Sequence, residues 1–155
     1  MKIRFISIES SRPDWAKKAF STYESKFNKS INIDWLGLKP VSRIGNYNAL
    51  DVVEKESNLL QSKVKKNEFV IALDKEGVSM STEKLRFQFD NWISSSKDIS
   101  IIIGGPDGLS QKFIKQSDFC WSLSQLTFPH SIVPVIVLEQ IYRVWSMTQN
   151  HPYHK

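Results

Sequence analysis

Two short segments of this chain are almost wholly apolar, FVIAL at residues 69–73 and ISIII at residues 99–103. Strands that are apolar on both faces are typical of a parallel sheet with helices on each side, because water reaches neither face. Segments with helical spacing of apolar residues lie between the predicted strands, and parallel neighbours need such crossovers. The alternation predicts an α/β fold with a largely parallel sheet flanked by helices.

Five strands and five helices are predicted along the chain. FVIAL is expected to end at the turn DKEG, residues 74–77. Ser81 or Thr82 is expected to cap the third helix. Pro134 is compatible with the last helix because it falls in its first turn. The strands are predicted at residues 2–8, 31–38, 69–73, 99–103 and 119–123, and the helices at residues 11–27, 49–64, 82–93, 110–117 and 132–148.

The length and composition fit a single domain spanning residues 1–155. No apolar run reaches the roughly 18 residues that a membrane span needs. The N-terminus lacks the long apolar segment of a signal peptide, and the single cysteine, Cys120, excludes an internal disulfide. We therefore expect a protein of the reducing cytoplasm.

The positive charge lies in the first part of the chain. Residues 1–66 contain thirteen Lys and Arg against seven Asp and Glu, whereas the rest contains eight against nine. This asymmetry indicates a surface that faces a polyanion. The alternative is that these lysines are simply solvated, because an excess of +6 is mild.

The last predicted helix, residues 132–148, has almost no polar face. A helix that is apolar nearly all round is buried on all sides. In so small a chain this pattern points to a subunit interface as readily as to the core. We predict a homodimer, since two-fold dimers are the commonest closed assembly.

Three predicted strands end in loops that could form a ligand site, because ligands of open α/β sheets bind at the carboxyl ends of the strands. The loops are residues 74–77, 104–108 and 122–130. Adjacent glycines at 104 and 105 let a ligand approach the backbone closely. The alternative for residues 104–108 alone is a tight turn into a capped helix. Three loops at equivalent strand ends favour a pocket.

The common ligand motifs are absent from the sequence. It has no G-x-G-x-x-G, no G-x-x-x-x-G-K-[ST] and no G-x-S-x-G. His151 and His154 lack the close-spaced partners of a metal site, so no metal is predicted. The remaining interpretation is a backbone-lined site for an uncharged or zwitterionic cofactor, with the tail NHPYHK nearby.

Three segments carry a resemblance to a known family: IIIGGPDGLS at 101–110, WSLSQLTFPH at 121–130 and LEQIYRVWSMTQNHPYHK at 138–155. In this order and at these spacings, the chain resembles the ribosomal RNA large subunit methyltransferase H family (RlmH, also called YbeA) of the SPOUT superfamily. The resemblance spans the whole chain. It implies a deep C-terminal trefoil knot that binds S-adenosylmethionine, a topology that general folding rules would not propose.

The resemblance also implies a reaction and a partner. The family methylates N3 of a pseudouridine in 23S ribosomal RNA and acts as a homodimer on assembled ribosomes. The resemblance further implies that the C-terminal tail of one subunit reaches the site of the other. The implied cofactor-binding residues are Leu73, Gly104, Leu123, Ser124, Gln125, Leu126, Thr127 and Phe128.

Three residues near the C-terminus are expected to carry the chemistry. His154 could accept a proton near neutral pH, Tyr153 could stack on the base, and Arg143 could hold a phosphate or the developing anion. The alternative for Arg143 is an ion pair on the helix surface with Glu139, four residues earlier. A structural role in the tail is the preferred interpretation of His151 and Pro152.

Two departures from the family pattern remove positive charge near the expected site. Pro134 stands where the family commonly has arginine, and Val78 stands where it often has lysine. Neither position belongs to the cofactor loops or the tail, so the activity is still expected. The alternatives left open are a catalytically silent ribosome-binding module, a methyltransferase for transfer RNA, and metal binding by the tail histidines.

Overall fold

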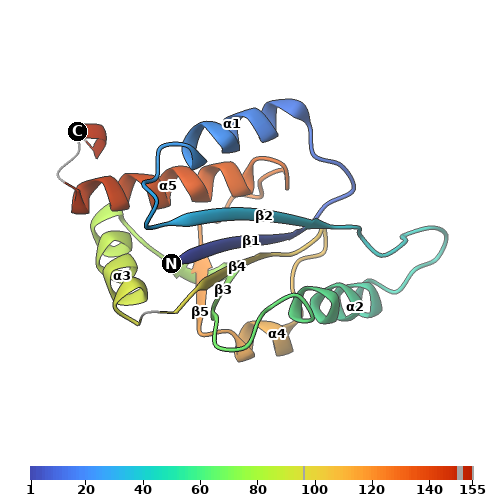
Figure 1. The fold of residues 1–155 in the computed structure, drawn as a ribbon. Helices are drawn as coiled ribbons and strands as arrows, with labels where there is room; N and C mark the ends of the chain where they lie inside the picture. Colours follow the sequence, from blue (N-terminus) through green and yellow to red (C-terminus); the bar gives the residue numbers. More distant parts are fainter. Residues whose placement is uncertain (96, 150–151, 155) are drawn as a thin grey trace.

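The computed structural model describes residues 1–95, 97–149 and 152–154, the side chain of His154 excepted, and shows a parallel sheet between two layers of helices (Figure 1). Its five strands are arranged in the order β2-β1-β4-β3-β5. The predicted α/β class is confirmed. The elements are β1 (Lys2–Ile8), α1 (Asp14–Glu24), β2 (Asn32–Leu38), α2 (Ala49–Gln61), β3 (Phe69–Ser79), α3 (Thr82–Ser94), β4 (Ile99–Ile103), α4 (Gln111–Gln116), β5 (Phe119–Ser122), α5 (Val133–Thr148) and the 3-10 turn η1 (Pro152–His154).

The sheet buries side chains on both faces, which explains the apolar strands. Alternate residues point to opposite faces of a strand. On one face, Phe5 and Ile101 pack with residues of α1, α3 and α5, and on the other, Ile6 and Ile102 pack with residues of α2 and α4. Figure 1 shows α1 and α5 on one side of the sheet and α2 and α4 on the other.

Strand β3 is longer than the sequence predicted, and the prediction that it ends at Leu73 is wrong. Leu73 and Val78 both pair with Trp121 of β5, so residues 74–77 are accommodated as an irregularity inside one strand. Gly77 makes this possible, because a Cβ there would lie 2.8 Å from backbone atoms of Cys120 and Trp121. The turn-like composition of DKEG therefore marks a strand interruption and not a strand end.

The helix ends largely follow the predicted signals. Ser81 caps α3 by accepting a hydrogen bond from the Lys84 N–H, so the first of the two predicted caps is the one used. Pro134 lies in the first turn of α5, as predicted. Helices α1 and α2 end earlier than the apolar spacing suggested, since Phe27 and Val64 lie beyond their last turns but still pack on the core.

Helix α5 is only partly enclosed by its own chain. Val137, Leu138 and Val144 are fully buried, whereas Val135 and Ile136 remain partly exposed on the other side. The homodimer stays a prediction, and the partly exposed Val135 and Ile136 leave apolar surface for a second copy to cover. The trefoil knot also stays a prediction. Within the described part of the chain, no helix has the length and apolar character to cross a membrane.

Candidate functional site

A pocket of about 340 Å³ lies beside the irregularity of β3 and at the carboxyl ends of β4 and β5. Because these neighbouring strands are parallel and paired, residues 73–75 of β3 lie next to the last residues of β4 and β5 and to the loops that follow them. The three segments selected from the sequence therefore contribute to a single cavity, although the first of them lies inside a strand. It is lined by Leu73, Asp74, Lys75, Ile103, Gly104, Gly105, Pro106, Asp107, Gly108, Trp121, Leu123, Ser124, Leu126, Thr127, Phe128, His130 and Val133.

Seven of the eight residues expected to bind a cofactor line this pocket. They are Leu73, Gly104, Leu123, Ser124, Leu126, Thr127 and Phe128. The eighth, Gln125, belongs to the same loop but is exposed and does not line the cavity. The structure thus brings together residues up to 55 positions apart in the chain.

The glycine loop, residues 104–108, is a tight turn that also forms part of the pocket wall. The Gly108 N–H donates to the Gly105 carbonyl at 2.9 Å, and Gly108 has a φ of 82°. A Cβ at Gly104 would lie 2.7 Å from the backbone carbon and oxygen of Gly108. The two interpretations of this loop, a tight turn and a ligand-binding wall, are therefore compatible.

This geometry predicts that Gly104→Ala destabilises the fold. The added methyl meets backbone atoms, so the turn must open or the strand must shift. Overpacking of this kind costs about 1–3 kcal/mol. Chemical denaturation of wild type and variant measures the difference, and an unchanged unfolding midpoint would show that the turn relaxes freely.

Helix α2 holds the glycine loop through a buried carboxylate. Glu56 is fully buried and accepts hydrogen bonds from Arg43 Nη1 and Nη2 at 2.7 and 2.9 Å. Arg43 Nε donates to Asp107 in the glycine loop at 3.0 Å. Next to Glu56, the Ser57 hydroxyl accepts from the Ser110 N–H at 2.9 Å, which fixes the other end of the loop. The pocket wall is thus anchored at two points on one helix.

The pocket itself carries more negative than positive charge. Asp74, Lys75 and Asp107 line it. The carboxylate of Asp74 accepts from the Glu76 N–H at 2.9 Å, and Asp107 is paired with Arg43. Its apolar side chains, which include Leu73, Leu123 and Phe128, offer flat contact area beside these charges. Such a cavity suits a ligand with an apolar or aromatic part and a positive group.

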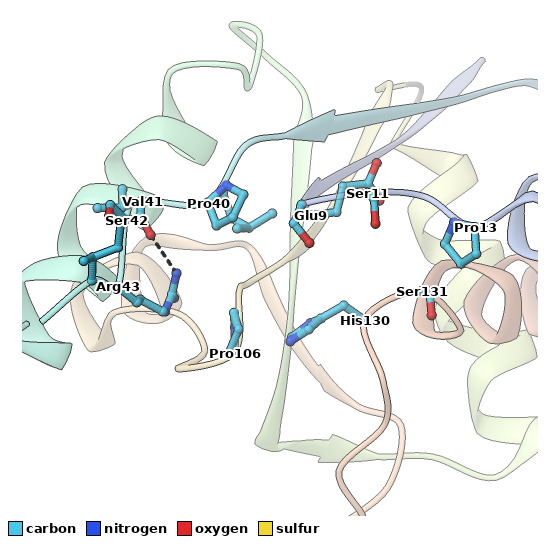
Figure 2. Close-up of a pocket in the computed structure, with 13 residues that line it drawn as sticks. Glu9, Ser11, Pro13, Pro40, Val41, Ser42, Arg43, Pro106, His130 and Ser131 are labelled. Carbon is cyan, nitrogen blue, oxygen red and sulfur yellow. Dashed lines mark hydrogen bonds between the residues drawn. The ribbon is translucent and has the colours of Figure 1, made fainter.

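A second pocket, of about 580 Å³, lies beside the first at the carboxyl ends of β1 and β2 (Figure 2). Pro106 and His130 line both cavities. The sequence analysis missed this site because the segments after these strands carry no glycine motif. The available signal was a pair of serine-containing segments, ESS at 9–11 and PVSR at 40–43, each following a predicted strand.

His130 stands between the two cavities. In Figure 2 its ring extends from the segment before α5 toward Pro106. Burial lowers the pKa of His130, and the positive Arg43 acts in the same direction, while Glu56 opposes them. The imidazole is therefore neutral at physiological pH, with one nitrogen that donates and one that accepts hydrogen bonds.

The C-terminal residues form a separate polar and aromatic cluster on α5. The hydroxyl of Tyr153 lies 3.1 Å from Glu139 Oε1 and 3.2 Å from the hydroxyl of Tyr23. Arg143 donates to the same Glu139 oxygen at 2.6 Å, and its guanidinium carbon lies 5.2 Å from the centroid of the Tyr153 ring. The ion pair between Arg143 and Glu139 that the sequence suggested as an alternative is thus present.

Burial is the main cause that raises the pKa of Tyr153, helped by the Tyr23 hydroxyl and the negative charge of Glu139. The phenol therefore stays protonated at neutral pH and acts as a hydrogen-bond donor. Tyr153 is unsuited to accept a proton in this arrangement. That leaves its hydroxyl and its ring as the groups able to position another molecule.

The structure does not bring Arg143 or Tyr153 into the pocket of their own chain. Val133 is the α5 residue that lines the pocket, and Arg143 follows it by ten residues, roughly 15 Å along the helix axis. Within one chain Tyr153 packs on α1 and α5, so the expectation that the tail reaches the cofactor site of a second subunit stays a prediction. The side chain of His154, and all of His151, lie outside the described residues.

No group of three or more metal-ligating side chains gathers in the part of the chain that the structure describes. The hypothesis that the tail histidines bind a metal falls outside this part.

Comparison with known proteins gives a whole-chain match. Residues 1–154 match a family model described as "Predicted SPOUT methyltransferase". Three curated relatives, from Hydrogenovibrio crunogenus, Thioalkalivibrio sulfidiphilus and Methylobacillus flagellatus, are 36%, 35% and 36% identical. Each match covers 100% of this chain and 99% of the relative, and each relative is named "Ribosomal RNA large subunit methyltransferase H".

A solved structure from Haemophilus influenzae Rd KW20, "a probable methylase family protein", resembles the fold with a TM-score of 0.56. The similarity covers 96% of this chain and 68% of the other at 10% sequence identity. At this identity the comparison supports the fold alone. It agrees with the parallel sheet and helical layers described above.

Proposed function

Because the chain belongs to the SPOUT methyltransferases, and within them to the ribosomal RNA large subunit methyltransferase H family, we propose that it methylates 23S ribosomal RNA. The methyl donor is S-adenosylmethionine, and the acceptor is N3 of pseudouridine 1915 in assembled ribosomes. The observation that carries this proposal is the convergence of the β3 irregularity and the loops after β4 and β5 into one pocket, in a chain whose whole length matches the family.

The pocket of about 340 Å³ beside the β3 irregularity and the ends of β4 and β5 fits the chemistry of this donor. S-adenosylmethionine supplies a methyl group on a positively charged sulfonium and carries an ammonium, a carboxylate and an adenine. Asp74 favours its net positive charge, and Leu73, Leu123 and Phe128 provide apolar contact for the adenine. Because glycine has no Cβ, the donor can approach the backbone N–H and C=O groups of the glycine loop closely. The predicted cofactor-binding residues that line the pocket would hold the donor, with Gln125 in the loop between Ser124 and Leu126. They are Leu73, Gly104, Leu123, Ser124, Leu126, Thr127 and Phe128.

The residues near the C-terminus would handle the RNA base. Methylation at N3 requires loss of the imide proton, so a nearby group must accept it or stabilise the resulting anion. Arg143 would stabilise the anion, and protonated Tyr153 would donate a hydrogen bond or stack on the base. His154 would accept or orient the proton.

A homodimer would bring these residues to a pocket. Arg143 and Tyr153 lie along α5 away from the pocket of their own chain, so a second copy is needed to supply them. The partly exposed Val135 and Ile136 provide apolar surface for such contact. Because the proposed substrate is the ribosome, we expect the protein to act in the cytoplasm.

Methyl transfer from labelled S-adenosylmethionine tests the proposed function. The substrates are ribosomes that lack the modification, protein-free 23S RNA and transfer RNA, with cofactor binding measured by calorimetry. We expect saturable cofactor binding and transfer to ribosomes only. Transfer to transfer RNA would redirect the substrate assignment, and absence of cofactor binding would make the chain a silent ribosome-binding module.

A further inference from the structure

An exposed lysine just beyond α1 lies over the tyrosines that hold the C-terminal turn. The Nζ atom of Lys26 is 5.2, 5.4 and 5.1 Å from the ring centroids of Tyr23, Tyr142 and Tyr153. These rings belong to α1, α5 and η1, and Figure 1 places the end of α1 and η1 at the same end of the molecule. One cation therefore contacts three elements that are distant in the sequence.

The tyrosine cluster, Tyr23, Tyr142 and Tyr153, is held together by its own contacts. The centroids of Tyr142 and Tyr153 lie 4.8 Å apart, and the centroid of Tyr23 lies 6.2 and 6.4 Å from them. The Tyr153 hydroxyl is also within hydrogen-bond distance of Glu139 and of the Tyr23 hydroxyl. The negative faces of the rings attract the Lys26 ammonium. Because the lysine already has a platform, it loses less side-chain freedom when it binds a ligand.

The charge of Lys26 is not neutralised by a carboxylate. Among the residues that the structure describes, Lys26 takes part in no ion pair. The other cation over the Tyr153 ring, Arg143, is paired with Glu139 at 2.6 Å. Tyrosine rings attract a cation but carry no net charge themselves. The Lys26 ammonium is therefore able to bind an anion.

A more ordinary role for Lys26 would be to stabilise the C-terminus of α1. This helix ends at Glu24, and a positive charge near a last turn interacts favourably with the helix dipole. That role depends only on position along α1. It requires no contact with α5 or η1, whereas the ammonium lies over rings from both. The placement points to a task that Lys26 shares with the C-terminal turn.

We propose that Lys26 binds a backbone phosphate of the target RNA, beside the base that Tyr153 contacts. The inference rests on the proposed function, in which Tyr153 donates to the base or stacks on it. A base and its phosphate are joined through one ribose, so a base at the Tyr153 ring brings phosphate oxygens close to the Lys26 ammonium. Lysine suits this contact because its ammonium is a compact charge with three donors. Such a contact positions the RNA without reading its sequence.

Ribosome binding at several salt concentrations tests this inference, because each phosphate contact releases counterions from the RNA. S-adenosylhomocysteine replaces the donor, so that no methyl transfer follows binding. Lys26→Met keeps an unbranched stem against the rings and removes the charge. We expect it to bind ribosomes about tenfold more weakly than wild type at low salt. This difference should narrow about threefold when the salt concentration rises from about 50 to about 200 mM.

Two further variants control for general effects of charge. Lys26→Arg keeps the positive charge and should bind ribosomes with nearly the affinity and salt dependence of wild type. Lys112→Met removes an exposed lysine from α4, on the opposite face of the sheet, and should also match wild type. The same loss and the same narrowing in Lys112→Met would show a diffuse attraction and overturn the assignment.

Single-turnover methyl transfer at saturating ribosomes separates phosphate binding from a structural role. A residue that only binds substrate changes the concentration needed for saturation and leaves the saturated rate unchanged. We expect this result for Lys26→Met. A slow saturated rate with wild-type ribosome affinity and salt dependence would show that Lys26 only holds the C-terminal turn, and would overturn the inference. If wild type transferred no methyl while Lys26→Met still weakened ribosome binding as expected, the proposed reaction would fall and the phosphate contact would stand.

Discussion

A chain truncated after Asn150 is expected to transfer methyl groups at least about 100-fold more slowly in a single turnover, while it binds S-adenosylmethionine as before. The physical reason is the division of the molecule into two regions. The cofactor pocket lies beside the irregularity of β3 and at the ends of β4 and β5, whereas Tyr153 contacts Glu139 and Tyr23 on α5 and α1. Removal of the tail should therefore leave the pocket intact and remove the groups that handle the base.

The control for this truncation is Tyr153→Phe, which keeps the ring against Tyr142 and removes only the hydroxyl. If the hydroxyl donates to the base, transfer should fall with unchanged cofactor affinity, while the loss of its hydrogen bonds to Glu139 and Tyr23 lowers the unfolding midpoint only slightly. If the ring alone matters, Tyr153→Phe should remain active while the truncated chain is not. Full activity of the truncated chain would make the tail a bystander. Unchanged activity of the full chain in a chelator would remove metal binding by the tail from consideration.

Glu68→Gln is expected to lower the free energy of unfolding by about 3–5 kcal/mol, because it leaves a buried positive charge without its partner. Both Glu68 oxygens accept from Arg4 Nη1 at 2.9 Å, and one also accepts from the Ser100 hydroxyl at 2.6 Å and the Lys65 N–H at 2.8 Å. The Glu68 side chain is only 3% exposed. Arg4 Nε is a buried polar atom without a hydrogen-bond partner in the described structure, so Arg4 depends on Glu68.

The stability difference between wild type and Glu68→Gln should depend on pH. Burial opposes ionisation, but hydrogen bonds from Ser100, the Lys65 N–H and Arg4 outweigh it and lower the pKa of Glu68. The contribution is therefore present above the unfolded-state pKa of about 4.3 and is lost as the pH falls through the lower folded-state pKa. Urea denaturation at pH 7 and at pH 3 measures this change.

The matched control is the exposed pair between Arg86 and Asp90 on α3. Asp90→Asn should cost no more than about 0.5 kcal/mol at pH 7, because water screens this pair. Equal losses in Glu68→Gln and Asp90→Asn would contradict the account of the buried network. A difference between wild type and Glu68→Gln that stayed constant down to pH 3 would contradict the pH dependence.

Much of the fold could be predicted from the sequence where one physical signal acts alone. The run at 99–103 is almost wholly apolar because both faces of the sheet are covered, and the strands at 2–8 and 99–103 begin and end where predicted. The segment DKEG misled the prediction because its composition is that of a turn. In the structure, β5 pairs with residues both before and after DKEG. These pairs join segments more than 40 residues apart, so composition along the chain does not indicate them.

The candidate site, too, could be predicted only in part from the sequence. The segments at 74–77, 104–108 and 122–130 could be grouped, because each was predicted to follow a parallel strand and parallel strands place their carboxyl ends at one edge, although β3 continues beyond the first segment. The pocket after β1 and β2 could not, since its walls depend on Arg43 reaching both Glu56 and Asp107. The position of Tyr153 away from the pocket follows from aromatic packing on Tyr23 and Tyr142, which residue spacing does not encode.

The most direct test of the central claim is to identify the methylated atom. Ribosomes that lack the modification are mixed with an excess of the protein and labelled S-adenosylmethionine for one turnover, and the RNA is then digested to nucleosides and analysed by mass spectrometry. The account predicts one labelled methyl per large subunit, recovered as N3-methylpseudouridine. Label on any other nucleoside, or none with the cofactor bound, would contradict it.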